Sequence, residues 1–110
     1  MFKYIFRVEV EVEPMEGTTL PTDTAGAFVN VYVGANHIRD AIEKVETQLL
    51  KDCYKPVYTY AAYEMDLDNN DYDTNEEGYP NNKDLIKIQE SRTMWYSPFN
   101  CFPPEEKEIH

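Results

Sequence analysis

Cysteine, histidine and long apolar runs are scarce in this sequence. The 110 residues include two cysteines and two histidines. Two cysteines are too few for a disulfide framework, and neither belongs to a C-x-x-C or Cys/His cluster. Cys53 and Cys101 are expected to be reduced thiols, and a bridge between the two is the alternative. No apolar run reaches the roughly 18 to 20 residues that a membrane-spanning helix needs. The amino-terminal residues lack the features of a secretory signal peptide, and a cytoplasmic location is therefore expected.

The common catalytic motifs are also missing. The sequence has no G-x-S-x-G, no H-E-x-x-H and neither of the glycine-rich nucleotide-binding motifs. His37 stands at the start of a predicted helix, where the helix dipole disfavours a protonated imidazole. His110 belongs to a segment expected to fray. We therefore expect a protein without catalytic activity. No cofactor is expected either, except a calcium ion if the acidic residues bind one.

Basic residues are few relative to acidic ones. Ten Lys and Arg residues stand against 21 Asp and Glu residues, which gives a net charge of −11. Such a surface repels nucleic acid and anionic membranes, so neither is expected as a partner. The charge is also uneven, because residues 64–77 contain no Lys or Arg. These fourteen residues hold seven of the acids: Glu64, Asp66, Asp68, Asp71, Asp73, Glu76 and Glu77.

Several segments have the pattern of β-strands. Apolar and charged residues largely alternate over residues 2–13, which predicts an antiparallel strand with one face in water. Residues 27–35 and 55–65 are rich in β-branched and aromatic residues and predict two further strands. A fourth, short strand is predicted at residues 93–97, and the residues after it are expected to be irregular. Most of the nine Tyr, five Phe and one Trp are expected in the core or in strands.

Two segments have the pattern of helices. Residues 37–52 predict an amphipathic helix with Asn36 as its N-cap, and residues 81–93 predict a shorter helix capped by Asn81 or Asn82. The first helix has an apolar stripe at spacings of three and four, formed by Ile38, Ala41, Ile42, Val45, Leu49 and Cys53.

This order of elements predicts an α+β domain over residues 1–104. We expect two layers, with one mixed or antiparallel sheet of about four strands and two helices on one face. The helix between the second and third strands suggests a parallel, right-handed crossover, related to the split β-α-β arrangements. Residues 66–80 form an acidic loop between the third strand and the second helix, and residues 105–110 form a frayed acidic tail.

One interpretation of the acidic loop is a calcium site. In the spacing of an EF-hand loop, Asp66, Asp68 and Asn70 occupy positions 1, 3 and 5, and Glu77 occupies position 12. Position 6 is Asp71, where the turn favours glycine. The segment before the loop is also predicted to be a strand rather than a helix.

The other interpretation is a surface for a basic partner protein, because carboxylates interleaved with tyrosine can pair with Lys and Arg. This predicts a non-catalytic binding module, similar in type to small acidic inhibitor or immunity proteins that block nucleases. The predicted partner-binding residues are Glu64, Asp66, Asp68, Asp71, Tyr72, Asp73, Glu76 and Glu77.

A third alternative is a homo-oligomer formed through the sheet edges or the aromatic carboxyl-terminal segment.

Four stretches together resemble small bacterial or phage-type proteins of unassigned function. They are "YIFRVEVEVEP", "AFVNVYVGANHIRDAIEKVETQLL", the acidic "DYD" and the late aromatic "MWYSPF". The resemblance covers most of the chain. It implies a small cytosolic α+β domain, and it implies no activity and no site residues.

Overall fold

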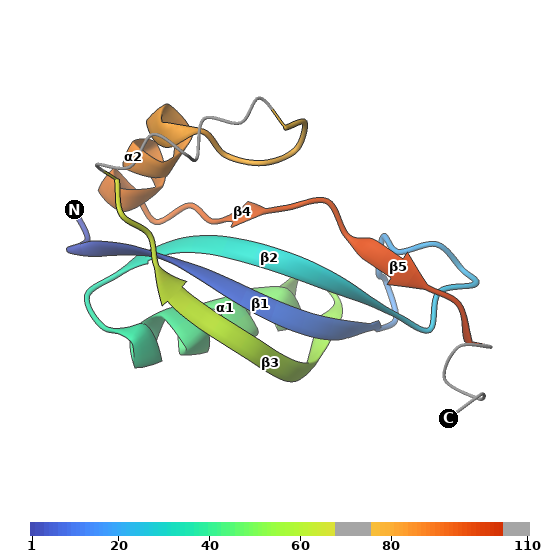
Figure 1. The fold of residues 1–110 in the computed structure, drawn as a ribbon. Helices are drawn as coiled ribbons and strands as arrows, with labels where there is room; N and C mark the ends of the chain where they lie inside the picture. Colours follow the sequence, from blue (N-terminus) through green and yellow to red (C-terminus); the bar gives the residue numbers. More distant parts are fainter. Residues whose placement is uncertain (68–75, 105–110) are drawn as a thin grey trace.

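The computed structural model describes residues 1–67 and 76–104 and contains one antiparallel sheet with two helices (Figure 1). The predicted α+β class is confirmed. Among the described residues, no helix is long and apolar enough to cross a membrane. In chain order the elements are β1 (Tyr4–Pro14), β2 (Gly26–Ala35), α1 (Ile38–Lys51), β3 (Tyr54–Glu64), α2 (Asn82–Glu90), β4 (Trp95–Tyr96) and β5 (Asn100–Phe102).

Strand β1 lies between β2 and β3 in the sheet. The strand order is β3-β1-β2-β4, and β5 also pairs with β2. Because β2 and β3 are both antiparallel to β1, they run parallel to each other with β1 between them. Helix α1 connects these two parallel strands. The connection is therefore of the split β-α-β kind that the sequence suggested.

The face of the sheet that contacts α1 forms the main core. The period of two along a strand places the apolar residues of β1 on this face, together with alternate residues of β2. Ala41, Val45 and Leu49 recur every four residues along α1 and pack onto them, fully buried. The strand residues of this core are Phe6, Val8, Val10, Val12, Ala27, Val29, Val31, Val33, Ala35 and Tyr54.

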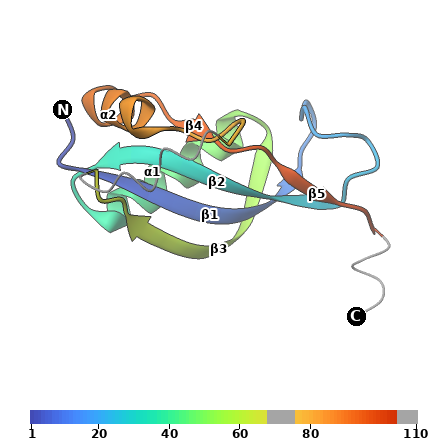
Figure 2. The same ribbon diagram turned by 45° about the horizontal axis from the view of Figure 1, so that its top comes forward.

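Helix α2 packs on the opposite face of the sheet, whereas the sequence analysis placed both helices on one face. Leu85 and Ile88 of α2 form a separate buried cluster with Ile5 and Tyr32. Ile5 alternates with the core residues of β1, so it points away from α1. It is apolar in a row of otherwise charged side chains and gives α2 a place to dock. Figures 1 and 2 show α2 beside the start of β1 and apart from α1.

The two helices begin in different ways. Asn81 caps α2 through a capping box, in which its side chain accepts from Asp84 N at 3.0 Å and the Asp84 carboxylate accepts from Asn81 N. Asn81 is one of the two caps that the sequence predicted, and Asn82, the other, is the first residue of the helix. Helix α1 begins after His37, which makes no side-chain capping bond. Asn36, the predicted cap, instead accepts a hydrogen bond from Lys3 N at 2.8 Å and ties the start of the chain to this turn.

Strand β5 was not predicted, since its three residues lie in a segment expected to be irregular. It pairs with the start of β2, where Gly26 faces Phe102. A Cβ atom on Gly26 would lie 2.5 Å from the Phe102 ring. Gly26 therefore lets the ring approach the sheet closely.

The sequence predicted Cys53 on the apolar stripe of α1, and this prediction was wrong. Cys53 lies beyond the end of the helix, which is at Lys51. Its φ angle is 68°, in the left-handed region that favours glycine, and its N–H donates to Leu50 O at 3.1 Å. The turn thus reverses the chain into β3 at the expense of backbone strain. Both Cys53 and Cys101 are free thiols.

We expect Cys53→Gly to raise the free energy of unfolding by up to about 1 kcal/mol, because glycine adopts the left-handed conformation without the penalty of about 1–2 kcal/mol. Urea denaturation measures the change. Cys53→Ala is the matched control, since it also removes the thiol but keeps the strain. An alanine variant as stable as the glycine variant contradicts the explanation.

Candidate functional site on the open face of the sheet

Helix α2 covers its face of the sheet at one end and leaves the rest open. On the open part, large aromatic side chains from β2, β3 and β5 lie side by side. Phe28 is 41% exposed, Tyr58 60% and Tyr60 53%. The Tyr60 ring centroid lies 4.7 Å from that of Tyr58 and 5.8 Å from that of Phe28, and Phe102 lies 5.4 Å from Phe28. These four residues are called the open aromatic patch.

An irregularity in β3 explains how Tyr60 reaches this position. The register pairs Glu9 with Ala61 and Val10 with Thr59, so it passes over Tyr60. Tyr60 is thus the extra residue of a bulge, and such residues turn a side chain out of the regular ladder. Thr59, on the other face, donates a hydrogen bond to Glu46 of α1.

Carboxylates from β1 accompany the aromatic rings. The Tyr60 hydroxyl donates to Glu11 Oε1 at 2.8 Å, and this bond raises the pKa of Tyr60 above its ordinary value because ionisation would lose it. A hollow of about 400 Å³ lies beside this pair. It is lined by Glu9, Val10, Phe28, Val29, Asn30 and Tyr60.

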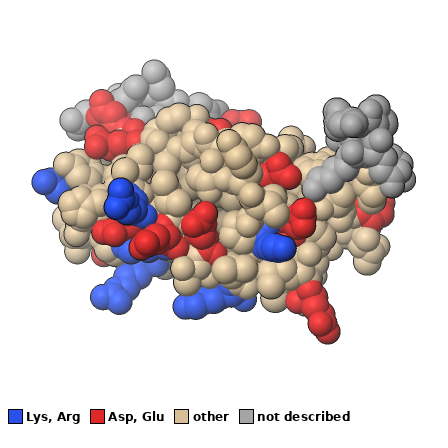
Figure 3. Space-filling model, turned by 90° about the horizontal axis from the view of Figure 1, so that it is seen from below, with Lys and Arg blue, Asp and Glu red and all other residues tan. Residues whose placement is uncertain are grey.

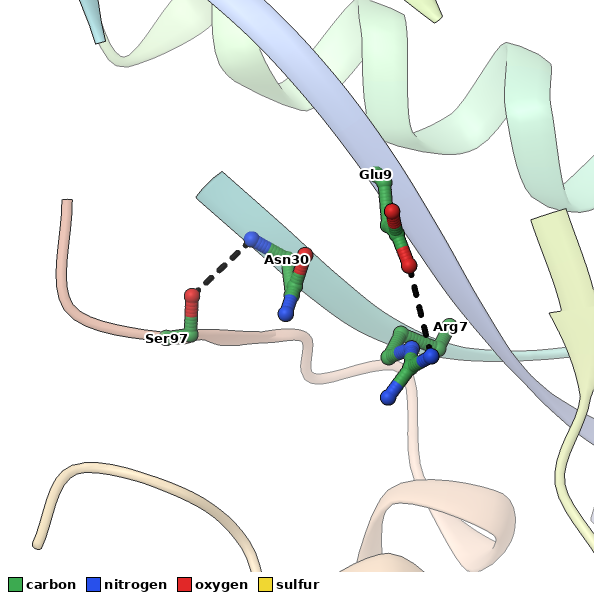
Figure 4. A network of polar contacts seen from close by, with 4 residues as sticks. All are labelled: Arg7, Glu9, Asn30 and Ser97. Atoms are coloured by element: carbon green, nitrogen blue, oxygen red, sulfur yellow. Dashed lines mark hydrogen bonds and ion pairs between the residues drawn. The ribbon is translucent and has the colours of Figure 1, made fainter. Parts of the chain in front are cut away.

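Arg7 separates the open aromatic patch from the part of the sheet that α2 covers. Its Nη2 lies 3.3 Å from Glu9 Oε2 (Figure 4), and its guanidinium lies 4.7 Å from the centre of the Tyr63 ring. The outer edge of β2 is occupied nearby, because Asn30 N donates to Ser97 Oγ at 2.9 Å and Ser97 N donates to Asn30 O at 2.8 Å. The strands that carry the patch are therefore fixed by pairing: β3 pairs with β1, and β2 pairs with β1 on one edge and with β4 and β5 on the other.

The predicted acidic loop begins and ends close to this face. Of the predicted contact residues, Glu64, Asp66, Glu76 and Glu77 are described, and all four are exposed. Burial raises the pKa of Tyr32, Arg7 opposes this rise, and the nearby Glu76 carboxylate adds to it. Glu76 O accepts a hydrogen bond from Tyr79 N at 3.2 Å, and Tyr79 packs against the buried cluster of Ile5 and Tyr32, so Glu76 lies near the α2 end of the open face. The remaining predicted contacts, Asp68, Asp71, Tyr72 and Asp73, lie outside the described residues.

The predicted calcium ligands are split in the same way. Asp66 and Glu77 are described, whereas Asp68 and Asn70 are not. Within residues 1–67 and 76–104, no three His, Cys, Asp or Glu residues gather as a metal site. The calcium site remains a prediction from the sequence.

Reasoning from the sequence missed the open aromatic patch. Tyr58 and Tyr60 alternate with Val57 and Thr59, but most aromatic residues were assigned to the core or to strands without regard to which face α1 would cover. The charged face of β1 could have predicted the patch, because aromatic residues of neighbouring strands on that same face have no apolar helix to pack against and stay exposed.

On the side of the molecule seen in Figure 3, acidic and basic side chains lie close together between larger uncharged areas.

Comparison with models of protein families, with curated proteins and with solved structures finds no match to this chain. Function is therefore argued from the site itself.

We expect Glu11→Gln to lower the pKa of Tyr60 towards its ordinary value, because the amide is a weaker acceptor and carries no charge that opposes ionisation. Titration of ring-labelled tyrosine followed by NMR resolves Tyr60 from the other tyrosines. Glu16→Gln, in an exposed loop, removes the same charge away from the patch. An equal pKa shift in both variants contradicts a local hydrogen bond.

Proposed function

We propose that this protein is a non-catalytic binding module that holds a partner protein with a basic surface on the open aromatic patch. The observation that carries the proposal is the exposure of Phe28, Tyr58 and Tyr60 beside one another, next to the Glu11 carboxylate. The predicted contact residues 64–77 belong to the proposal through Glu76, which is exposed at the α2 end of the same face. The proposal names the chemistry of the partner and leaves its identity to experiment.

Adjacent exposed rings support a binding role better than scattered ones do. Single exposed apolar residues are common on protein surfaces, but a contiguous group of them indicates an interaction site. Tyrosine also provides a large contact area while losing little side-chain entropy, and it is enriched among the residues that dominate binding energy. Tyr58 and Tyr60 have both properties, and their strand is fixed by pairing to β1.

Two features favour a basic partner. The net charge of −11 attracts a cationic surface and speeds its encounter with the protein. The chain also contains one cation held by a ring and a carboxylate beside the patch, since Arg7 stacks on Tyr63 while pairing with Glu9. Tyr60 and Glu11 offer the same combination of ring and carboxylate to an arginine of a partner.

The rings of the patch are a better contact than the outer edge of β3. Strand addition needs a regular, unpaired edge, and β3 has two register irregularities along its pairing with β1. Pro56, within the same strand, has no N–H to offer to an added strand. Such features protect an edge against pairing with another chain. A partner is therefore expected to rest on the face.

We expect Tyr60→Ala to weaken binding of the partner about tenfold or more, since an aromatic residue at the centre of a contact carries a large share of its energy. Glu11→Lys should also weaken it, by removing attraction and adding repulsion. A partner captured from lysate by the wild-type protein, then purified, is titrated by calorimetry against each variant at low and high salt.

Two variants match these changes elsewhere on the surface. Ile86→Ala shortens an exposed apolar side chain on α2, and Glu43→Lys reverses an exposed charge on α1. Both should bind the partner as the wild type does. Equal weakening by Ile86→Ala and Tyr60→Ala, or binding that salt does not change, contradicts the proposal. If the wild-type protein captures a second copy of itself, the homo-oligomer is supported instead.

A further inference from the structure

A second hollow, of about 390 Å³, lies at the opposite end of β2 from Phe28. Gly34 lines it and stands six positions along β2 from Phe28, a distance of roughly 20 Å. It is therefore distinct from the open aromatic patch. Its walls come from the start of the chain, β2, α1 and the segment after α2: Phe2, Val33, Gly34, Lys44, Ser91, Arg92, Thr93 and Met94.

The charge of this hollow is opposite to that of the chain. Among the described residues its lining includes Lys44 and Arg92 and no carboxylate, although acids outnumber bases 21 to 10 in the sequence. Lys44 Nζ is also held in place, because it donates to Gly34 O at 3.3 Å and lies 3.8 Å from the centre of the Phe2 ring. An anion entering here meets an ammonium group whose side chain is already ordered, which lowers the entropic cost of binding.

The rest of the wall suits an apolar group. Phe2, Val33 and Met94 supply aromatic and aliphatic surface. The Phe2 ring closes against the sheet because residue 34 is glycine, where a Cβ atom would lie 2.6 Å from the ring. A volume of about 390 Å³ is at the lower end of the range for small-molecule sites, which are mostly apolar with a few convergent polar groups.

We propose that this hollow binds a small monocarboxylate with an apolar body. The carboxylate lies between Lys44 and Arg92, and the apolar body contacts Phe2, Val33 and Met94. Asp40 and Glu43 line the neighbouring hollow together with Lys44 and Lys51, so its carboxylates are matched by its ammonium groups. Because Lys44 is shared with these carboxylates, a ligand with a single negative charge fits best. The site does not depend on the function proposed for the open aromatic patch.

The test compares three probes with the same six-carbon chain: hexanoate, 1-hexanol and hexylammonium. Each is titrated into the full-length protein and followed by the amide NMR signals of Gly34 and Thr93. We expect hexanoate to bind at least about tenfold more tightly than 1-hexanol, and hexylammonium to bind most weakly. Absence of hexanoate binding, equal binding of the three probes, or signals that move elsewhere on the protein overturns the proposal.

Two variants locate the charge. Lys44→Met keeps the methylene stem and removes the ammonium, and Arg92→Gln removes the charge of an exposed side chain. Each should weaken hexanoate about tenfold and leave 1-hexanol unchanged. Lys87→Met, on α2 and outside the hollow, is the matched control and should bind hexanoate as the wild type does. Equal loss in Lys87→Met and both site variants overturns the site by showing a general charge effect.

A free small acid and the carboxyl-terminal residue of a peptide share this chemistry. N-acetyl-leucine and N-acetyl-leucinamide separate the two sources. Tighter binding of acetyl-leucine than of hexanoate, with loss on amidation, assigns the site to a peptide end, whereas tighter binding of hexanoate assigns it to a free acid.

Discussion

The alternation of side chains along β1 is the constraint on which the rest of the structure depends. Because β1 is hydrogen-bonded to a strand on each edge, its orientation in the sheet is fixed. The side chains on each of its faces therefore determine what can pack on that side of the sheet. The face with Val8, Val10 and Val12 is buried under α1. The face with Arg7, Glu9 and Glu11 is charged, and it is the reason that the neighbouring aromatic rings remain in contact with solvent.

Ile5 is an exception in this pattern, with a large effect on the fold. It stands on the charged face of β1, yet it is buried against Leu85 and Ile88 of α2. One apolar residue at the start of the strand therefore brings the second helix to the second face. Since the next residue on that face is Arg7, the apolar contact ends there. The open aromatic patch begins beyond this point, so the positions of helix and patch have the same cause.

Periodicity predicted the elements whose pattern of apolar and polar residues is contained within the element itself. The alternation in β1 and the stripe of Ala41, Val45 and Leu49 are local, and the sequence was sufficient for both, while it narrowed the cap of α2 to Asn81 or Asn82. The face on which α2 docks and the existence of β5 were missed, because both depend on contacts between distant residues. The position of Tyr60 was missed for a related reason: a bulge is a property of the pairing between two strands and leaves little trace in either sequence.

The two candidate sites differ in local charge on a chain whose net charge is −11. Arg7 is engaged on the open face by Glu9 and Tyr63, so the patch beyond it carries the carboxylate of Glu11 beside aromatic rings. Lys44 is engaged by Gly34 O and Phe2, which leaves its positive charge at the wall of the second hollow. The roughly 20 Å between the sites exceeds twice the screening length of about 8 Å at physiological salt. A surface with a large excess of acids can therefore attract a cation at one end of β2 and an anion at the other, because each ligand responds mainly to the side chains within one screening length of it.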